Sequence, residues 1–270
     1  MRKTPVMRKN RNSADQMHRF SGPGTESRRM LHNVESKVLD AALTLAASLR
    51  DTNEHTVAAA AMDANGVIYT GVNVHHFTGG PCAEVVVLGV AAAAAAAAPL
   101  ITMVAVGKGG QGVLAPCGRC RQVLSDYFPD IGVIMPTWPN EQGPTRVRVS
   151  SLLPGTFLRP SAGPRPRVVY FSAQYFDAVE QGRRTSTLRF NDPTPLGLAT
   201  LVFEFDDGPR TLSGEVTGVR PALMQQLMDE DDTTHGAGTG EALLAASQLH
   251  YPGLSPECQM EHVSFRCLPA

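Results

Sequence analysis

Residues 81–99 read PCAEVVVLGVAAAAAAAAP, and residues 116–128 read PCGRCRQVLSDYF. Each stretch opens on a Pro-Cys pair and continues with residues that favour a helix, and Pro99 ends the first run. Apolar runs typical of buried strands lie before, between and after them, at residues 56–62, 67–74, 100–106 and 131–135. The pattern therefore alternates strands and helices around the two Pro-Cys pairs.

The order of these elements predicts the fold class. Apolar residues recur at helical spacing over residues 30–50, so a helix precedes the first strand. Asn65 and Gly66 separate the first two strand-like runs, and Asn-Gly between such runs is a strong hairpin signal. The whole order predicts an α/β domain whose mixed sheet is covered by helices on its faces.

A change of composition divides the chain into two domains. Four prolines lie among Gly, Ser and Arg before Arg167, which is a linker composition. A second pattern follows, with helices at 173–181, 221–228 and 241–250 and strands at 185–190, 196–205, 211–219 and 262–267. We predict a first domain over residues 30–158, a linker over 159–167 and a second domain over 168–270.

Charge and composition exclude several classes of protein. The chain has 270 residues and 43% of them are hydrophobic, so it can bury a core and is not wholly disordered. Residues 1–30 carry eight basic and two acidic side chains, and we expect a disordered basic tail over residues 1–29. No apolar run reaches the roughly 18 residues of a membrane span, and no secretory signal is recognisable. Five cysteines are too few for a secreted disulfide framework, so we expect a cytoplasmic protein with no membrane partner.

Three cysteines and one glutamate form the strongest functional pattern. Cys82 and Glu84 are followed, 35 residues after the first cysteine, by Cys117 and Cys120. A catalytic zinc site supplies three ligands and leaves the fourth position for water. Each Pro-Cys pair opens a helix, and the dipole of a helix favours a thiolate at its start. Cys117 and Cys120 lie one helical turn apart, so both sulfurs can face the same ion. We therefore predict a Zn²⁺ site with Cys82, Cys117 and Cys120 as ligands and Glu84 as the catalytic carboxylate.

Two other uses of these cysteines stay open. The Cys-x-x-Cys pair has the spacing of a redox motif, although a redox pair does not require Glu84. A structural zinc site takes a fourth ligand, for which His75 and His76 are candidates. Three thiolates over-charge a divalent ion, so we expect the guanidinium groups of Arg119 and Arg121 to donate to the sulfurs and offset the excess.

The motif and its surroundings resemble a known family. Residues 71–84, the Ala-rich run and residues 116–124 are similar to the cytidine deaminase family, and within it most closely to the blasticidin-S deaminases, over about residues 30–160. The resemblance implies a three-layer α/β/α domain, a zinc ion on the three cysteines, and a homotetramer or dimer formed through this domain. It also implies hydrolytic deamination of a cytosine-containing nucleoside (cytidine, deoxycytidine or an antibiotic such as blasticidin S), with Glu84 as proton shuttle.

The same resemblance assigns residues that bind the substrate. These are Asn73, Thr56, Ala83, Pro116 and Phe157. Cytidine deaminases carry a Glu two residues after the Asn, and this chain has His75 there. Phe157 stands where blasticidin-S deaminases have Tyr, and Thr56 keeps the hydroxyl of their Ser. The pocket is therefore expected to differ from one that holds an ordinary ribose.

A second resemblance concerns the C-terminal half. The residues that carry it are 182–189, 251–253 and 263–266. They are similar to the ASCH domain, a small β-barrel of the PUA-like superfold, and imply RNA or modified nucleobases as ligands of a pocket at Arg184, Thr187 and Arg189. From Val168 onward the chain carries six basic and fourteen acidic side chains, which argues against a broad phosphate-binding surface.

Two functions follow from these patterns. One is a zinc deaminase of a small-molecule nucleoside, fused to an accessory ASCH domain. The other is an RNA- or nucleotide-binding ASCH protein whose deaminase half is structural. The complete set of three cysteines and one glutamate favours the enzyme.

Overall fold

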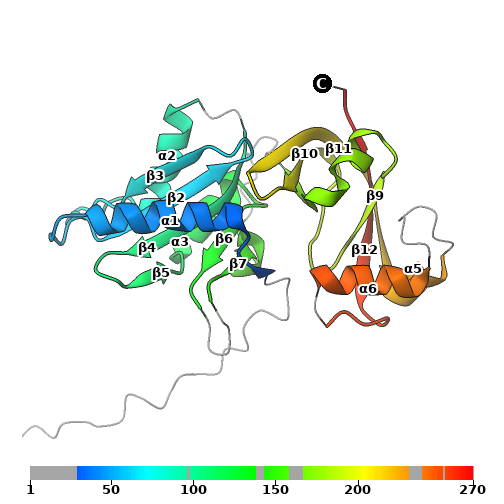
Figure 1. The fold of residues 1–270 in the computed structure, drawn as a ribbon. Helices are drawn as coiled ribbons and strands as arrows, with labels where there is room; N and C mark the ends of the chain where they lie inside the picture. The colour runs from blue at the N-terminus through cyan, green and yellow to red at the C-terminus, as the bar shows by residue number, and fades with distance from the viewer. Residues whose placement is uncertain are drawn as a thin grey trace, which may run out of the picture.

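The computed structural model describes six stretches of the chain: residues 29–95, 98–137, 143–157, 167–230, 239–251 and 253–269. Residues 1–28 of the predicted tail and residues 159–166 of the predicted linker lie outside these stretches. The two halves of the chain form two neighbouring bodies (Figure 1). The residue numbers of the domain boundaries stay a prediction. None of the helices in the described stretches is long and apolar enough to cross a membrane.

The first half builds a single mixed sheet with helices. Its elements are β1 (Arg29–Met30), α1 (Asn33–Ser48), β2 (Val57–Asp63), β3 (Ile68–Val72), α2 (Ala83–Ala93), β4 (Leu100–Gly107), β5 (Gly112–Leu114), α3 (Gly118–Tyr127), β6 (Gly132–Met135), β7 (Thr145–Arg148) and the 3₁₀ helix η1 (Val149–Leu152). The strand order is β1-β7-β6-β4-β2-β3, and β5 pairs with β4 beside this path. β4 and β6 are parallel and the other neighbours are antiparallel.

Helices cover both faces of this sheet (Figure 1). On one face, α1 packs through a buried cluster that includes Val38 and Ala58. On the other face, α2 and α3 pack through a cluster that includes Val87, Leu124 and Ala59. Ala58 and Ala59 are consecutive on β2, and consecutive strand residues point to opposite faces of a sheet. Small side chains on both faces of β2 let both helix layers approach it, and the predicted three-layer α/β/α fold is confirmed.

The second half builds a smaller, curled sheet with helices at its edges (Figure 1). Its elements are β8 (Val168–Ser172), the 3₁₀ helix η2 (Ala173–Tyr175), α4 (Phe176–Glu180), β9 (Ser186–Arg189), β10 (Gly197–Glu204), β11 (Pro209–Leu223), α5 (Met224–Asp229), α6 (Gly240–His250) and β12 (Gln259–Cys267). The strand order is β8-β10-β11-β12-β9. Stacked and edge-on phenylalanines, Phe171, Phe203 and Phe265, fill the concave core. The predicted second domain of strands with helices is confirmed.

Some element boundaries differ from the predictions. α2 ends at Ala93, short of the end of the Ala-rich run, and Ala95 has a left-handed φ of 51°. β11 runs on through Pro221, which pairs with Glu261 of β12, so the helix predicted from residue 221 begins at Met224. Proline has no N–H to donate to a neighbouring strand, but its fixed φ is compatible with an extended chain, so a strand can continue through it. Strands β1, β5, β7 and β8 have no counterpart among the predictions. The sequence predicts a disordered tail at Arg29 and the start of a helix at Met30, but both residues pair with β7.

Buried ion pairs join the two halves. The carboxylate of Asp130, which follows α3, accepts hydrogen bonds from the Arg167 guanidinium at 2.7 and 2.8 Å and from the main-chain N–H of Val168 at 3.0 Å. Arg148 of β7 lies 3.5 Å from Asp130 and 2.8 Å from Asp192. Both aspartates are buried. Each therefore depends on a partner in the other half to offset the hydration that it has lost.

A second buried arginine, Arg146 of β7, extends this group. Its guanidinium lies 3.1 Å from Glu35 of α1, 3.7 Å from Glu204 of β10 and 4.2 Å from the centre of the Tyr170 ring. Burial raises the pKa of Tyr170 to about 12, so its phenol keeps the proton that it directs at main-chain carbonyls of the first half, 3.0 and 3.1 Å away. We call the charged residues the interdomain ion cluster: Glu35, Asp130, Arg146, Arg148, Arg167, Arg189, Asp192 and Glu204.

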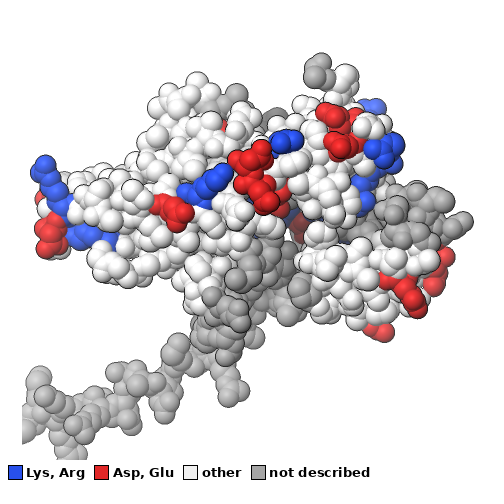
Figure 2. Space-filling view, viewed as in Figure 1, with Lys and Arg blue, Asp and Glu red and all other residues white. Residues whose placement is uncertain are grey.

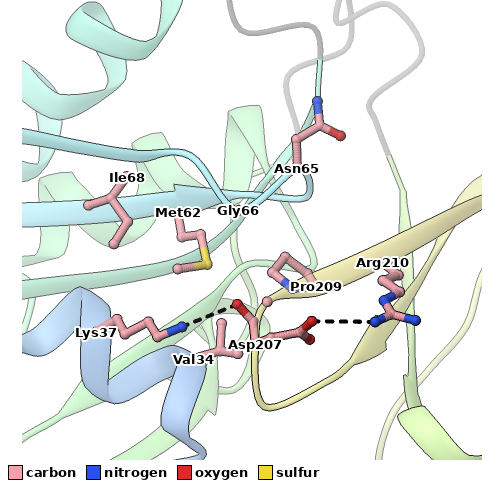
Figure 3. A pocket seen from close by; sticks show the side chains of 10 residues that line it. Val34, Lys37, Met62, Asn65, Gly66, Ile68, Asp207, Pro209 and Arg210 are labelled. Carbon is pink, nitrogen blue, oxygen red and sulfur yellow. Dashed lines mark hydrogen bonds and ion pairs between the residues drawn. The ribbon is translucent and has the colours of Figure 1, made fainter.

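A cleft of about 330 Å³ opens where the surfaces of the two halves meet (Figure 3). Its floor includes Lys37 of α1, which donates to the Asp207 carbonyl at 3.2 Å, while Arg210 pairs with the Asp207 carboxylate at 3.3 Å. Figure 2 shows charged side chains of both signs gathered along this junction. The cleft borders the end of β2 at Asp63. None of the three cysteines lines the cleft, so the cleft is separate from them.

Candidate metal centre

Three cysteine sulfurs meet at the N-terminal ends of two helices. Cys82 immediately precedes α2, Cys117 immediately precedes α3, and Cys120 lies in the first turn of α3. The Sγ atoms of Cys82 and Cys117 are 3.8 Å apart, and all three sulfurs lie within 4.8 Å of one another. Two ligands of a tetrahedral zinc ion with Zn–S bonds of about 2.3 Å are about 3.8 Å apart. The three sulfurs therefore fit one zinc ion.

The local electrostatics differ among the thiols. Burial acts to raise the pKa of Cys117, but the main-chain N–H groups of Cys120 and Arg119 donate to its sulfur, and its pKa is lowered overall. Burial and the nearby Glu84 carboxylate raise the pKa of Cys120. The start of α3 thus favours the thiolate form of Cys117 more than that of Cys120.

Glu84 lies beside the sulfurs without joining them. It belongs to the first turn of α2, and only 6% of it is exposed. Burial is the largest cause of the raised pKa of Cys120 and of Cys82. The negative charge of Glu84 is a further cause for both thiols, so Glu84 lies close to both. Its oxygens are nevertheless outside the group of ligand atoms that could hold an ion. This arrangement suits a carboxylate that transfers protons next to an open ligand position.

The predicted histidine alternatives find no support at this centre. Within the part of the chain that the structure describes, the group that could hold a metal consists of the three cysteines. His75 and His76 lie outside that group, and the His76 ring nitrogen Nδ1 lies 2.6 Å from the Thr78 hydroxyl. A structural zinc site needs four protein ligands, so three ligands with a free fourth position favour a catalytic site.

The two arginines of the motif bind main-chain oxygens. Arg121 donates from Nε to the Pro116 carbonyl at 2.9 Å and from Nη1 to the Leu152 carbonyl at 2.8 Å. Arg119 donates from Nη1 to the Gly80 carbonyl at 3.4 Å. Arg121 therefore braces the turn before the second ligand cysteine against η1. Donation from these guanidinium groups to the sulfurs stays a prediction.

Asn73 and Thr56 lie together where β3 ends and β2 begins. The Asn73 Oδ1 accepts hydrogen bonds from the main-chain N–H of Thr56 at 2.8 Å and of the next residue at 2.9 Å. The N–H of Val74 donates to the Pro81 carbonyl at 3.1 Å, which ties this pair to the turn before Cys82. The Nδ2 group of Asn73 donates to the Thr56 hydroxyl at 3.5 Å, so the amide joins the two strands at both of its ends. The substrate roles of Asn73 and Thr56 stay a prediction.

Two of the other predicted substrate residues adjoin the cysteines in the chain, and the third lies on a separate segment. Ala83 and Pro116 are buried next to ligand cysteines. Phe157 lies on the irregular segment after η1, with 68% of it exposed, and its carbonyl accepts a hydrogen bond from Gln122 of α3 at 2.9 Å. No sequence prediction named Gln122. Its position two residues after Cys120 on the same helix is the signal that could have found it.

The pocket predicted in the second half involves interior residues. Thr187 and Arg189 are buried, and Arg189 donates to the Tyr170 carbonyl at 2.6 Å. The Arg184 guanidinium lies 4.0 Å from the centre of the Tyr175 ring. Arg189 also lies 3.5 Å from Asp192, the residue that pairs with Arg148 of the first half. A nucleobase pocket at these residues stays a prediction.

Comparisons with known proteins bear on both halves. Residues 32–131 match the family model of the cytidine and deoxycytidylate deaminase zinc-binding region. The chain is 32% identical over 96 residues to a blasticidin-S deaminase from Bacillus cereus, which covers 32% of this chain and 68% of that protein. A mutant cytidine deaminase from Mycobacterium tuberculosis is 29% identical, with 45% of this chain and 97% of that chain covered and a TM-score of 0.37. An ASCH domain from Lactobacillus crispatus is 13% identical, with 37% and 78% covered and a TM-score of 0.29.

The first half has the three layers of the predicted deaminase domain and three sulfurs that could hold one metal ion. Its blasticidin-S deaminase relative is matched over 68% of the relative's own length. The chain belongs to the cytidine and deoxycytidylate deaminase family.

Proposed function

We propose that this protein is a zinc-dependent hydrolytic deaminase of a cytosine-containing nucleoside or nucleoside antibiotic. One observation carries the proposal: three sulfurs that fit a single zinc ion lie beside a buried carboxylate that is not a ligand. That combination leaves one coordination position for water and one proton-transferring group beside it. Hydrolysis of the amidine group of cytosine requires both.

The chemistry divides between the metal and Glu84. Cys82, Cys117 and Cys120 would hold the zinc ion, which when bound lowers the pKa of water and so supplies a nucleophile near neutral pH. Glu84 takes the proton that the attacking water loses and passes it to the ring nitrogen beside the reacting carbon. Glu84 then carries the second proton to the exocyclic amine as the carbon–nitrogen bond breaks. The ring keeps the oxygen and one proton as a uracil, and the amine leaves as ammonia with the other proton.

The substrate end of the site supports a nucleoside whose sugar departs from ordinary ribose. Asn73 offers its Nδ2 as a donor, and the Thr56 hydroxyl lies 3.5 Å from that atom. His75 is exposed at the position of the acidic residue that cytidine deaminases use with this Asn. The Bacillus cereus relative is a blasticidin-S deaminase, so blasticidin S joins cytidine and deoxycytidine as a candidate.

We also propose that the protein is a homo-oligomer through its deaminase half. The loop before α2 and α2 itself carry exposed apolar side chains, with Phe77 90%, Val74 44% and Val90 40% exposed. Exposed apolar groups of this kind favour contact with another protein surface. Light scattering of the purified chain measures the oligomeric state directly.

Zinc-loaded protein is expected to convert at least one of cytidine, deoxycytidine and blasticidin S. The conversion of cytosine to uracil lowers ultraviolet absorbance and releases ammonia, and both are measured on the three compounds in parallel. Protein stripped of metal with a chelator serves as the control and is expected to regain activity with zinc. No turnover of any compound would instead favour the binding-protein function, with a structural deaminase half.

A further inference from the structure

The 3₁₀ helix η1 connects the contact between the two halves to the metal centre. Arg148, the last residue of β7, directly precedes η1. Its Nη2 donates to the Asp192 Oδ2 at 3.0 Å, and its Nη1 lies 2.8 Å from the Oδ1 of the same carboxylate. Asp192 belongs to the second half and is buried. The start of η1 is therefore held by a bidentate ion pair that crosses between the halves.

A second attachment of η1 also depends on the second half. The main-chain N–H of Val149, the first residue of η1, donates to the Ile131 carbonyl at 3.0 Å. Ile131 follows Asp130, whose own carbonyl accepts a hydrogen bond from the Tyr170 hydroxyl at 3.0 Å. The Asp130 carboxylate accepts the N–H of Val168, as described above. Two residues of the second half thus hold the turn to which the start of η1 is bonded.

The end of η1 is bonded to the metal centre through Arg121 of α3. Arg121 donates from Nη1 to the Leu152 carbonyl at 2.8 Å and from Nε to the Pro116 carbonyl at 2.9 Å. Leu152 is the last residue of η1, and Pro116 directly precedes the ligand Cys117. Leu152 is also buried in the same apolar cluster as Leu124 of α3. One guanidinium group thus joins η1 to the turn that presents a ligand sulfur.

The turn before α3 needs support from outside itself. Residues 115–117 have no regular secondary structure, and Pro116 has no N–H with which to join a neighbouring strand. The Arg121 guanidinium supplies a hydrogen bond to the Pro116 carbonyl instead. Ligand distances in metal sites vary by only about 0.2 Å, so a small displacement of the Cys117 sulfur weakens the binding of zinc.

We propose that Asp192 of the second half is a positioning residue for the metal centre. Through Arg148 it fixes the start of η1, and η1 with Arg121 then fixes the turn that presents Cys117. The proposal rests on the zinc site of the proposed function and gives the second half a role that needs no nucleic-acid ligand. Asp192 acts on how tightly the sulfurs hold zinc, and not on the proton transfers at Glu84.

Hydrogen exchange of the full chain tests the first part of this connection. Amides of residues 149–152 are expected to exchange about tenfold faster in Asp192→Asn, because the weakened pair lets η1 open more easily. The substitution keeps the size of the side chain and one acceptor oxygen, so the variant is expected to fold. The matched control is Glu204→Gln, which weakens a 3.7 Å pair with Arg146 across the same junction. Equal acceleration in this control, or none in Asp192→Asn, overturns the proposal.

Competition for zinc with a chromogenic chelator tests the second part. Arg121→Ala is expected to lower the zinc affinity of the full chain about tenfold. Asp192→Asn is expected to lower it about threefold, within the range of coupling through a network of contacts. Arg121→Lys is expected to resemble Arg121→Ala, because lysine keeps the charge but lacks the planar fork that reaches both carbonyls. The double variant is expected to be no worse than Arg121→Ala alone, since both changes act through one contact.

A spectrum separates displaced ligands from a general loss of stability. In protein loaded with Co²⁺, visible absorption reports the geometry of the ligands, and it is expected to change in Asp192→Asn but not in Glu204→Gln. Wild-type protein that binds zinc without turnover contradicts the deaminase function alone. Unchanged zinc affinity in Asp192→Asn, even with faster exchange at η1, overturns the proposal, and so do multiplying effects of the Asp192 and Arg121 substitutions.

Discussion

Glu84→Gln lowers the turnover of the preferred substrate by about 10²- to 10⁴-fold, while zinc content stays equal to that of the wild-type protein. The amide has nearly the same size as the carboxylate, so the buried first turn of α2 keeps its packing. It cannot take a proton from water or return one to the substrate. Because Glu84 lies outside the ligand group, its loss leaves the three sulfurs in place. Zinc by elemental analysis and rate by absorbance are measured on the same sample.

The contrasting variant is Cys82→Ala. It removes one of the three sulfurs and is expected to lose both zinc and activity. The pair of variants therefore separates a proton-transfer role from a ligand role. Turnover that survives in Glu84→Gln would contradict the assignment of Glu84, and zinc loss in that variant would make it a ligand instead.

Asp130→Ala lowers the free energy of unfolding by about 3–5 kcal/mol, the usual cost of removing one partner from a buried ion pair. The substitution leaves the guanidinium of Arg167 and the N–H of Val168 without their acceptor, and it removes a contact of Arg148. The effect is large because these groups are buried between the two halves and water cannot replace the carboxylate without opening the contact. Urea unfolding followed by circular dichroism measures it.

Asp207→Ala is the matched control for this substitution. Asp207 lies at the same junction and pairs with Arg210 within the second half, and both side chains are more than half exposed. Exposed pairs of this kind contribute about 0–1 kcal/mol. Asp130→Asn keeps one acceptor oxygen and is expected to fall between the two. Equal effects of Asp130→Ala and Asp207→Ala would show that burial of the cluster does not matter to stability.

The first domain is largely predictable because its signals are local. Cys82 and Cys117 each precede a helix where the sequence predicts one, since proline and the helix-favouring residues after it mark the start. The Ala-rich run does not reveal where α2 ends, because alanine favours helix at every position. The end at Ala93 is set by the left-handed turn at Ala95 and the return of the chain to β4.

The parts that escaped prediction depend on partners far along the chain. Arg146 and Arg148 alternate with Val147, which is the period of a strand, but two arginines in four residues resemble a solvated surface. Arg146 is buried and Arg148 half-buried, because acidic groups from other parts of the chain, among them Asp192, offset their charges. Gln122 likewise escaped prediction, because its partners Thr156 and Phe157 lie 34 and 35 residues further along the chain. The ligand set was predictable because Cys117 and Cys120 lie one helical turn apart, and because the family resemblance assigns Cys82 to the same metal ion.

The interdomain ion cluster has a consequence for any attempt to isolate one half of this chain. Two of its pairs cross between the halves, Arg148 with Asp192 and Asp130 with Arg167. A fragment that ends before residue 167 removes Arg167 from the buried Asp130, and the complementary fragment removes Arg148 from the buried Asp192. Each fragment is therefore expected to be less stable than the same residues in the intact chain.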